Sequence, residues 1–600
     1  MVAIELFGRT KFPAITDAAY PLTLGPHNFY GFSLEPKLQP LTAKTEPSGP
    51  ITLPALTIIE NWCEIFLGRL RLKFEALLPD YLKAQPWFLG KNKTIKLTTI
   101  KRYFNLPLPV ENAAGLVFIQ VEYVEANPEL YFWPLAFAAG GEAARLQKNG
   151  VLELNWPDGR LHGLIYDALA SPTFARTALG FILRGERLLN ESQEIRAAHA
   201  VGGPVNLGGE MAGEPAIHGT PDGNVVIFFG EKFALKFFRR VEAGLHPELE
   251  TGRFLTEKKF PNCAPLLASL QYSNADDAPM TLAVVKAFIP QAKSAWDTTL
   301  DDLSRYYDRV FADAAQGHAP PAAPDEIANS VGTTIESARQ LGARTAELHL
   351  ALMSGLDGDE FSAEPMTPQY LRGLFQSMRS LATQNLRLLR KQLKQLPADL
   401  ATVAQRVIEL EPVIIQHYQD FTALRLAAKR THVHGDFHLG QVLWTGRDFM
   451  FLDFEGDATV PLSERRIKRS PLRDVARMVR SFHHAAYAGL RQQVESGIIP
   501  PESVPRFEPW VRHWNRTVSR AYLQSYCLNL GHSGILPDAP EQLRVMLLAY
   551  LLNQVVDELG DELRAHSDNV RAPLQAIILL TDEHMLQQIQ SALEGIPRKL

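Results

Sequence analysis

The chain has 600 residues, of which 46% are hydrophobic and 21% are charged, and its formal net charge is −5. This composition is typical of a globular protein with several domains. The slightly acidic balance argues against a nucleic acid partner, because a phosphate backbone is bound by a basic face. The three cysteines, Cys63, Cys263 and Cys527, are far apart and form no CxxC pair. We therefore expect a cytoplasmic protein without a disulfide framework, a signal peptide or a membrane-spanning segment.

The first third of the chain changes character twice. Residues 1–35 contain fragments such as HNFYGFSL, which are typical of short strands. Residues 36–54 are rich in proline, serine and glycine and are typical of a linker. An amphipathic helix then precedes the runs GLVFIQVEYV and ELYFWPLAF, which predict strands. The apolar face of that helix contains Leu70, Phe74, Leu77 and Leu78.

Strands give way to helices further along the chain. Residues 165–200 have a helical pattern, and NVVIFFGEKFALKFF predicts a β-hairpin that turns at Gly230 and Glu231. After the apolar strand MTLAVVKAFIP at 280–290, helical periodicity continues almost to residue 600. The interruptions are a loop at 317–326 and the segment 432–475. This order predicts an α+β protein with a strand-rich region before a helical one.

The segment HVHGDFHLGQ at 432–441, followed by the strand FMFLDFE at 449–455, is the most informative part of the sequence. Phosphoryl transfer needs a carboxylate near the acceptor hydroxyl, together with an amide and a second carboxylate that hold Mg²⁺. In this pattern Asp436 is the catalytic base, Gln441 the metal-binding amide and Asp453 the principal Mg²⁺ carboxylate. Glu455 is a candidate contact for a second metal ion.

A lysine upstream completes the pattern for a nucleotide site. Lys236 ends the run FALK and is placed to reach the α- and β-phosphates, with Glu250 on the next helix as its ion-pair partner and Glu248 as the alternative. No GxGxxG loop precedes Lys236, so the phosphate cradle is expected in the segment from Gly219 to Asn224.

A further acid, Asp474, lies where its carboxylate would brace the catalytic loop through backbone N–H groups. Taken singly, Asp474 also fits a helix cap or a salt bridge, and the lysine and glutamates fit a solvated surface. His434 and His438 are four residues apart, a spacing that binds zinc on a helix. Gly435 between them favours a loop and argues against zinc.

The longer motifs resemble the bacterial maltokinases. The resemblance rests on HGDFHLGQVLW, FLDFEGD, LSERRIKRSPLRDVARMVRSFHHAAY, KFFRRVEAGLHPELETGRFLTE and LPDYLKAQPWFLGKNKTIK. It implies a protein-kinase-like bilobal fold, with ATP and Mg²⁺ as cofactors and maltose 1-phosphate as product. It also implies a cap domain over 55–185, a β-rich N-lobe over 186–290 and a helical C-lobe over 291–600.

Residues 1–35 resemble the last β-strands of trehalose synthases, in ELFGRTKFPAI and YPLTLGPHNFYGFSL. This resemblance implies a remnant of a longer fusion chain, and a trehalose synthase as a covalent or non-covalent partner. The alternative is an ordinary N-terminal hairpin that packs on the cap domain.

One helix departs from the maltokinase pattern EKALYELxYELxxRP. The lysine position holds Gln554, the two tyrosine positions hold Asp557 and Asp561, and the arginine position holds His566. Carboxylates suit sugar hydroxyls or a protonated amine better than the face of a sugar ring. The alternative is that these acids are simply solvated on an amphipathic helix. The candidate sugar-binding residues are His434, His438, Gln554, Asp557, Glu558, Asp561 and His566.

The sequence thus predicts an ATP-dependent sugar kinase, with maltose as the acceptor that the resemblance implies. An amino sugar such as glucosamine and an aminoglycoside are the alternatives within enzymology. A pseudokinase that only binds a neighbouring enzyme is the alternative outside it.

Overall fold

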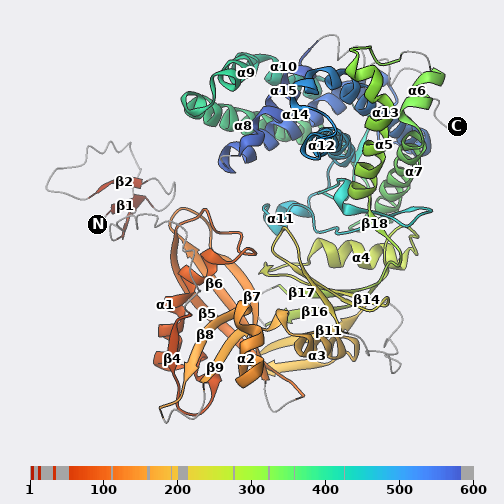
Figure 1. Cartoon of the computed structure of the whole chain (residues 1–600). Helices are drawn as coiled ribbons and strands as arrows, with labels where there is room; N and C mark the ends of the chain where they lie inside the picture. Colours follow the sequence, from red (N-terminus) through yellow and green to blue (C-terminus); the bar gives the residue numbers. More distant parts are fainter. Residues whose placement is uncertain are drawn as a thin grey trace. The chain divides into compact units, whose positions relative to one another are not determined.

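The computed structural model describes the backbone of three short N-terminal strands and most of residues 53–582. Within 53–582 it leaves out 110–112, 158–161, 191, 201–213, 275–277, 322–323, 357, 425 and 566. The chain forms two compact units, Met1–Leu53 and Pro54–Leu600. Figure 1 shows the elements of both.

The first unit contains three short antiparallel strands in the order β2-β1-β3. They are β1 (Val2–Glu5), β2 (Lys11–Ala14) and β3 (Phe32–Glu35). The strands expected within 1–35 are therefore confirmed. The predicted linker at 36–54 lies outside the described residues up to 52.

The second unit begins with a seven-stranded sheet in the described part of the chain, ordered β4-β8-β9-β7-β6-β5, with β15 paired to β7. Helix α1 (Gly68–Ala84) covers it and buries Phe74 and Leu78, so the predicted amphipathic helix is confirmed. The sheet strands are β4 (Ala55–Thr57), β5 (Ile95–Pro107), β6 (Ala113–Tyr123), β7 (Glu129–Ala139), β8 (Gly150–Asn155), β9 (His162–Asp167) and β15 (Arg240–Val241). Short helices beside them are η1 (Trp62–Phe66), α2 (Gly140–Leu146), η2 (Gln147–Asn149) and η3 (Ala168–Ala170).

A second sheet follows, antiparallel in the order β10-β11-β16-β17-β14-β13-β12. Its strands are β10 (Arg187–Asn190), β11 (Gln193–His199), β12 (Ala216–Gly219), β13 (Val225–Phe229), β14 (Phe233–Phe237), β16 (Leu266–Ser273) and β17 (Met280–Ala287). The predicted hairpin is confirmed, since β13 pairs with β14 across Gly230. The rings of Phe118 on β6 and Tyr272 on β16 lie 5.0 Å apart, so the two sheets contact each other.

The prediction of helix across 165–200 is wrong for most of that range. Only α3 (Pro172–Leu183) is an α-helix, and β10 and β11 form an antiparallel hairpin after it. In β11 the buried Ile195 and Ala197 alternate with exposed or half-buried side chains. Pairing with β16 gives this segment its structure, because cross-strand packing outweighs the helical propensity of its Glu, Arg and Ala residues.

The rest of the second unit is mainly helical and shares one large apolar core. Its α-helices after α4 (Pro247–Glu257) are α5 (Ala295–Ala315), α6 (Pro324–Val331), α7 (Thr334–Leu352), α8 (Pro368–Gln392), α9 (Ala398–Glu409), α10 (Glu411–Ala423), α11 (Leu462–Arg465), α12 (Leu472–Glu495), α13 (Val504–Leu530), α14 (Pro540–Ala565) and α15 (Arg571–Leu580). Its single-turn helices are η4 (Leu393–Gln395), η5 (Leu439–Gln441), η6 (Pro501–Ser503) and η7 (Asp568–Val570). Its short strands are β18 (Lys293–Ser294), β19 (Glu364–Pro365), β20 (Lys429–Arg430), β21 (Val442–Trp444) and β22 (Phe449–Phe451).

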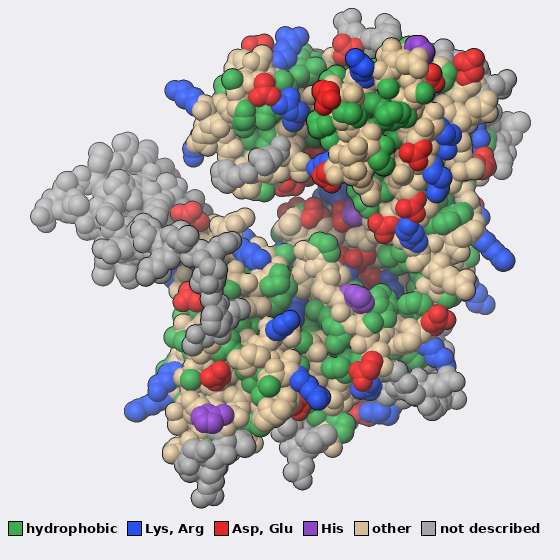
Figure 2. All heavy atoms as spheres, in the orientation of Figure 1, with side chains coloured by type: hydrophobic (Ala, Val, Ile, Leu, Met, Phe, Trp, Pro, Cys, Tyr) green, Lys and Arg blue, Asp and Glu red, His purple; other side chains and the backbone are tan. Residues whose placement is uncertain are grey.

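The strand-rich and helical parts of the second unit meet at a hollow. Figure 2 shows acidic side chains gathered in this hollow, with the sheets below and the helices above. None of the described helices is both long and apolar enough to cross a membrane.

Candidate active site

The loop before η5 is held from below by a buried carboxylate. The N–H groups of His434 and Gly435 donate to Asp474 on α12, over 2.7 Å and 3.0 Å. Asp474 has no exposed surface, and His349 on α7 lies 3.2 Å from the same carboxylate. Two backbone N–H groups on one charged acceptor fix the loop strongly. The prediction that Asp474 braces this loop is confirmed.

Asp436 follows directly and points toward two positive or polar partners. Its carboxylate accepts a hydrogen bond from Arg477 on α12 over 2.6 Å and lies 3.5 Å from Nε2 of His438. Burial acts to raise the pKa of Asp436, but the hydrogen bond from His438 and the charge of Arg477 outweigh it. The pKa is therefore held well below its usual range, and Asp436 is ionised at neutral pH.

The two histidines of the loop differ in exposure. Nδ1 of His438 accepts from the N–H of Gly440, so in the neutral ring Nε2 carries the proton that faces Asp436. His434 is 1% exposed, and its Nε2 donates to the carbonyl of Leu452 over 2.6 Å. The prediction that His434 binds sugar is corrected here, because its side chain is buried between the loop and the strand that follows. It serves to join the two.

Lys236 does reach the segment after β22. Its amine contacts Asp453 and lies 2.6 Å from Glu455, while Asp222 is 4.0 Å away. Lys236 lies on β14 of the second sheet, so a side chain from the strand-rich part meets two acids of the helical part. These attractions raise the pKa of Lys236 well above its usual value, against the effect of burial, and the amine is charged.

The predicted partner of Lys236 is wrong. Glu250 on α4 forms a two-bond pair with Arg466, at 2.9 Å and 2.7 Å. The alternative, Glu248, contacts Lys286 on β17. The lysine chooses the acids after β22 because they lie within bonding distance, whereas the first turn of α4 faces two other basic side chains.

The backbone places Asp453 and Gln441 close to each other in the chain's path. The N–H of Leu452 donates to the carbonyl of Gln441 over 3.0 Å, so the residue before Asp453 is tied to η5. Asp453 has a positive φ of 61°, a conformation that costs free energy for a residue with a Cβ. Such strain is tolerated where surrounding contacts hold it, and it is common at functional sites.

A turn between β12 and β13 adds two residues to this cluster. Asn224 donates to Asp222 over 2.6 Å and to the two oxygens of Glu455 over 3.2 Å and 3.3 Å. The sequence analysis placed Asn224 at the nucleotide but missed Asp222. The available signal was the dipeptide Asp222-Gly223 at a hairpin turn, which predicts the turn without showing what the acid faces.

Oxygen atoms of Asp222, Asp453 and Glu455 all lie within 4.8 Å of one another. Lys236 and the Glu248–Lys286 pair complete the charged groups named around them, so four carboxylates and two ammonium groups give a formal charge of −2. Carboxylate oxygens are the ligands that Mg²⁺ prefers, and a divalent cation would balance this charge. These described residues therefore fit Mg²⁺.

Two acids in the cluster have shifted pKa values. Burial raises the pKa of Glu455 well above its usual range, although Lys236 opposes this effect. For Asp222 burial also acts upward, but hydrogen bonding to Glu455 and the charge of Lys236 lower the pKa to about 2. A hydrogen bond between one protonated and one ionised carboxyl group accounts for this opposite behaviour.

The predicted sugar-binding residues of α14 lie in three different environments. Glu558 pairs with both terminal nitrogens of Arg480 and with His484, at 2.8 to 2.9 Å. The side chain of Asp561 is 73% exposed and pairs with Arg564 on its own helix. These two acids are therefore occupied by protein cations or solvated, which corrects their expected role as sugar ligands. His566 lies outside the described residues.

Gln554 and Asp557 remain on the side of α14 that faces the loop. Gln554 accepts from Nε of Arg477 over 3.1 Å, and the same guanidinium reaches Asp436 and lies 3.5 Å from Asp457. Burial raises the pKa of Asp557, and the neighbouring Asp561 raises it further. Arg477 thus joins Asp436 to α14, a connection that the sequence analysis did not predict.

Comparison with known proteins gives distant similarity to one named activity. No protein-family model matches the sequence. The chain is 26% identical over 250 residues to a glucosamine kinase of Streptacidiphilus jiangxiensis, which covers 41% of this chain and 46% of that protein. A glucosamine kinase of Mycolicibacterium smegmatis is 22% identical over 334 residues, 56% of this chain and 72% of that protein. The match thus spans about half the length of the first relative.

Solved structures extend the similarity over most of the fold. A glucosamine kinase in complex with glucosamine, ADP and inorganic phosphate superposes with a TM-score of 0.52 at 17% identity, covering 83% of this chain and 97% of that one. A second crystal form of a glucosamine kinase gives a TM-score of 0.53 at 18% identity, covering 83% and 95%. The chain is an α+β protein with a bilobal kinase-like fold, a β-rich lobe and a helical lobe.

Proposed function

We propose that this chain is an ATP- and Mg²⁺-dependent sugar kinase. The observation that carries the proposal is the meeting of Lys236 with Asp453 and Glu455, beside a loop in which Asp474 and Arg477 hold Asp436. A lysine, two carboxylates and a separate ionised aspartate are the side chains that phosphoryl transfer requires. The similarity to glucosamine kinases supports the same reaction.

The side chains divide the work by position. Asp453, Glu455 and Asp222 hold Mg²⁺, and Gln441 is the proposed amide ligand. The ion supplies positive charge between the phosphate oxygens. Lys236 binds the phosphates from β14, and Asp436 accepts a hydrogen bond from the sugar hydroxyl that attacks. Because Arg477 keeps Asp436 ionised, its main contribution is to orient that hydroxyl, with the proton following as the new bond forms.

We propose an amino sugar, with glucosamine first, as the acceptor. Asp457 and Asp557 flank Arg477 next to Asp436, so two acids that are free of the Glu558 network are available for a protonated amine. His438 is the proposed contact for a sugar hydroxyl, with 42% of its side chain exposed. Maltose stays the prediction of the maltokinase resemblance, and the same assay tests it.

Nucleotide-coupled turnover tests the proposal directly. Formation of ADP is measured with glucosamine, N-acetylglucosamine, maltose, glucose, trehalose and an aminoglycoside, each with Mg²⁺ and ATP. We expect turnover with glucosamine and a loss of at least about 100-fold on N-acetylation, because that removes the amine's charge. Asp436→Asn is expected to stop turnover while ATP affinity changes little. No turnover with any sugar would favour the pseudokinase alternative, and turnover with maltose alone would reject the amino sugar.

A trehalose synthase partner and the domain boundaries also remain proposals. The cap domain is proposed at 55–185, the N-lobe at 186–290 and the C-lobe at 291–600. Co-elution of the purified chain with a trehalose synthase on gel filtration tests the partner, and separate elution would reject a stable complex.

A further inference from the structure

The β12–β13 turn joins the second sheet to the carboxylate cluster through one amide side chain. Asn224 is 5% exposed, and its NH₂ group faces the carboxylates of Asp222 and Glu455. An amide has only one end that donates, so its orientation decides whether it attracts or repels these carboxylates. Whatever holds the oxygen end of Asn224 therefore controls the geometry of the cluster.

Arg239 holds that oxygen end. Its backbone N–H donates to Oδ1 of Asn224 over 3.1 Å. The rest of Arg239 is anchored to the first sheet: its carbonyl accepts from the N–H of Phe132 over 2.7 Å, its guanidinium pairs with Asp167, and its charge lies 4.5 Å from the centre of the Trp87 ring. Arg239 is 4% exposed, so these contacts are protected from water.

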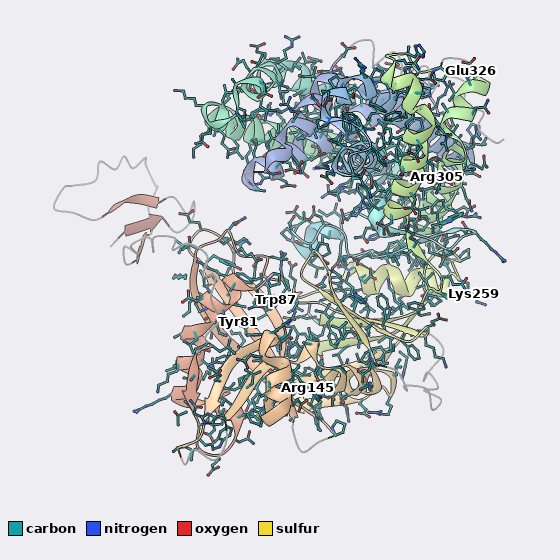
Figure 3. The ribbon with its side chains drawn as sticks, viewed as in Figure 1. Tyr81, Trp87, Arg145, Lys259, Arg305 and Glu326 are labelled. Atoms are coloured by element: carbon teal, nitrogen blue, oxygen red, sulfur yellow. The ribbon has the colours of Figure 1, made fainter. Side chains whose placement is uncertain are left out.

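A second contact from the first sheet reaches the same turn. Gly223 has a φ of 83°, and a Cβ built there would lie 2.3 Å from the carbonyl oxygen of Trp87. Figure 3 labels Trp87 at the side of the first sheet that lies nearest the second. Backbone meets backbone here, and neither atom is the far end of a flexible side chain, so an added methyl group must push the turn away.

We propose that the first sheet sets the position of the β12–β13 turn, and that Arg239 and the Gly223–Trp87 contact are positioning elements for the cation site. This inference rests on the proposed function, since it assigns a role to residues behind the proposed Mg²⁺ ligands. In metal sites the residues that orient the ligands commonly change metal affinity about 10- to 100-fold when they are replaced. The first sheet thus has a role in binding a divalent cation although it contributes no ligand.

Gly223→Ala tests the proposal, with Gly230→Ala as the matched control. Gly230 lies in the next turn of the same sheet, also has a positive φ, and has nothing within 4 Å of a built Cβ. The control therefore carries the same kind of backbone strain without the clash. The probe is Mn²⁺, whose free concentration is read by electron paramagnetic resonance in a titration of the full chain without nucleotide.

We expect Gly223→Ala to weaken Mn²⁺ binding about 10-fold or more and to raise the KM for Mg-ATP, while the KM for sugar stays within about 2-fold. Gly230→Ala is expected to bind Mn²⁺ like the wild type. Arg239→Lys keeps the charge beside Asp167 but loses the stacking on Trp87, and we expect a smaller loss in the same direction. Equal Mn²⁺ binding by the wild type, Gly223→Ala and Arg239→Lys would overturn the positioning role.

Two further outcomes separate this inference from the proposed function. If the wild type neither binds Mn²⁺ nor turns over ATP, the proposed function fails and the positioning role fails with it. If Gly223→Ala unfolds at a clearly lower temperature than the control, Arg239→Lys decides. In that case a normal Mn²⁺ affinity in Arg239→Lys rejects the inference, and a weakened affinity supports it.

Discussion

Arg477 contacts acceptors from three separate segments of the chain. It lies 2.6 Å from Asp436, 3.5 Å from Asp457 and 3.1 Å from Gln554. A guanidinium presents several donors in one plane, so a single side chain can hold a loop, the segment after the metal strand and helix α14 together. The carboxylate of Asp436 is thereby both ionised and fixed in direction.

Replacing Arg477 by alanine is expected to change the pH profile as well as the rate. The folded pKa of Asp436 is depressed, so losing the cation lets it rise, and the acid limb of kcat/KM moves to higher pH. We expect kcat to fall about 100-fold, because the hydroxyl is no longer well oriented. Steady-state kinetics between pH 4 and pH 8 measure both effects.

Arg491→Ala is the matched control on the same helix, since Arg491 is exposed. It removes one positive charge from α12 away from the loop and should leave the pH profile unchanged. An acid limb in Arg477→Ala at the wild-type pH would show that Arg477 does not tune Asp436.

Single residues were predictable where the chain itself fixes the spacing. Asp436, Gln441 and Asp453 follow from one loop and one strand, and the brace by Asp474 follows from the helix that comes next. The partner of Lys236 was not predictable in this way, because the choice between an acid on α4 and acids after β22 is a matter of distance in space. The contact of Lys236 with Asp453 joins residues 217 positions apart, while their functional roles remain predictions.

Helix α12 shows how one element organises the site. Asp474, Arg477 and Arg480 are three residues apart, so they lie along one side of the helix. They bind in turn the loop before η5, the carboxylate of Asp436 and Glu558 on α14. The same helix buries a long apolar face in the core of the helical lobe, so the polar row is held rigidly.

The link between α12 and α14 predicts a difference between two acids of α14. Removing one partner from a buried pair leaves an uncompensated charge, so Glu558→Gln is expected to destabilise the fold by about 3 kcal/mol. Asp561→Asn, the control on the same helix, is expected to cost less than about 0.5 kcal/mol, because Asp561 is exposed. Urea unfolding at pH 7 measures both, and equal values would contradict the link.

The pH dependence gives the same link a second test. Burial opposes it, but His484 and Arg480 lower the pKa of Glu558 from 4.5 to about 2. A depressed carboxylate pKa stabilises the fold above the unfolded pKa, and this contribution is lost as the pH falls through the folded value. The stability gap between the wild type and Glu558→Gln should therefore narrow between pH 4.5 and pH 2.

Elements were predictable where the periodicity agreed with the final packing. The helix α1 and the β13–β14 hairpin match their patterns, whereas β10 and β11 are strands in a segment whose composition suits a helix. The departure of α14 from the maltokinase pattern was visible in the sequence. Its consequence was not, because the basic side chains that occupy Glu558 come from α12, about 75 residues earlier in the chain.

On the scale of the whole second unit, the strand-rich and helical lobes are joined by ion pairs. Lys236 meets Asp453 and Glu455, Glu250 meets Arg466, and Arg465 meets Glu242. All of these link the second sheet and its flanking segments to residues 453–466. This stretch follows the catalytic loop, so closing the lobes and building the cation site are the same event in this structure.

A divalent cation is therefore expected to stabilise the whole unit. The cluster carries a formal charge of −2 without the cation, and a ligand that binds only the folded chain adds RT ln(1 + [L]/Kd), about 1.4 kcal/mol when its concentration is ten times Kd. For a unit of this size we expect thermal unfolding to move upward by about 1 to 2 °C. Differential scanning calorimetry with MgCl₂ or MnCl₂, against NaCl of equal ionic strength, measures the shift.

Asp453→Asn should lose this shift, because it removes a carboxylate at the point where Lys236 and the cation compete for the same oxygens. Glu464→Gln changes the charge by the same amount on the exposed surface of α11 and should keep the shift. A cation effect of equal size in both variants would mean that the ion binds elsewhere, since general screening acts on all surface charges alike. A shift confined to the wild type and Glu464→Gln would instead tie the stability of the lobe contact to the carboxylates after β22.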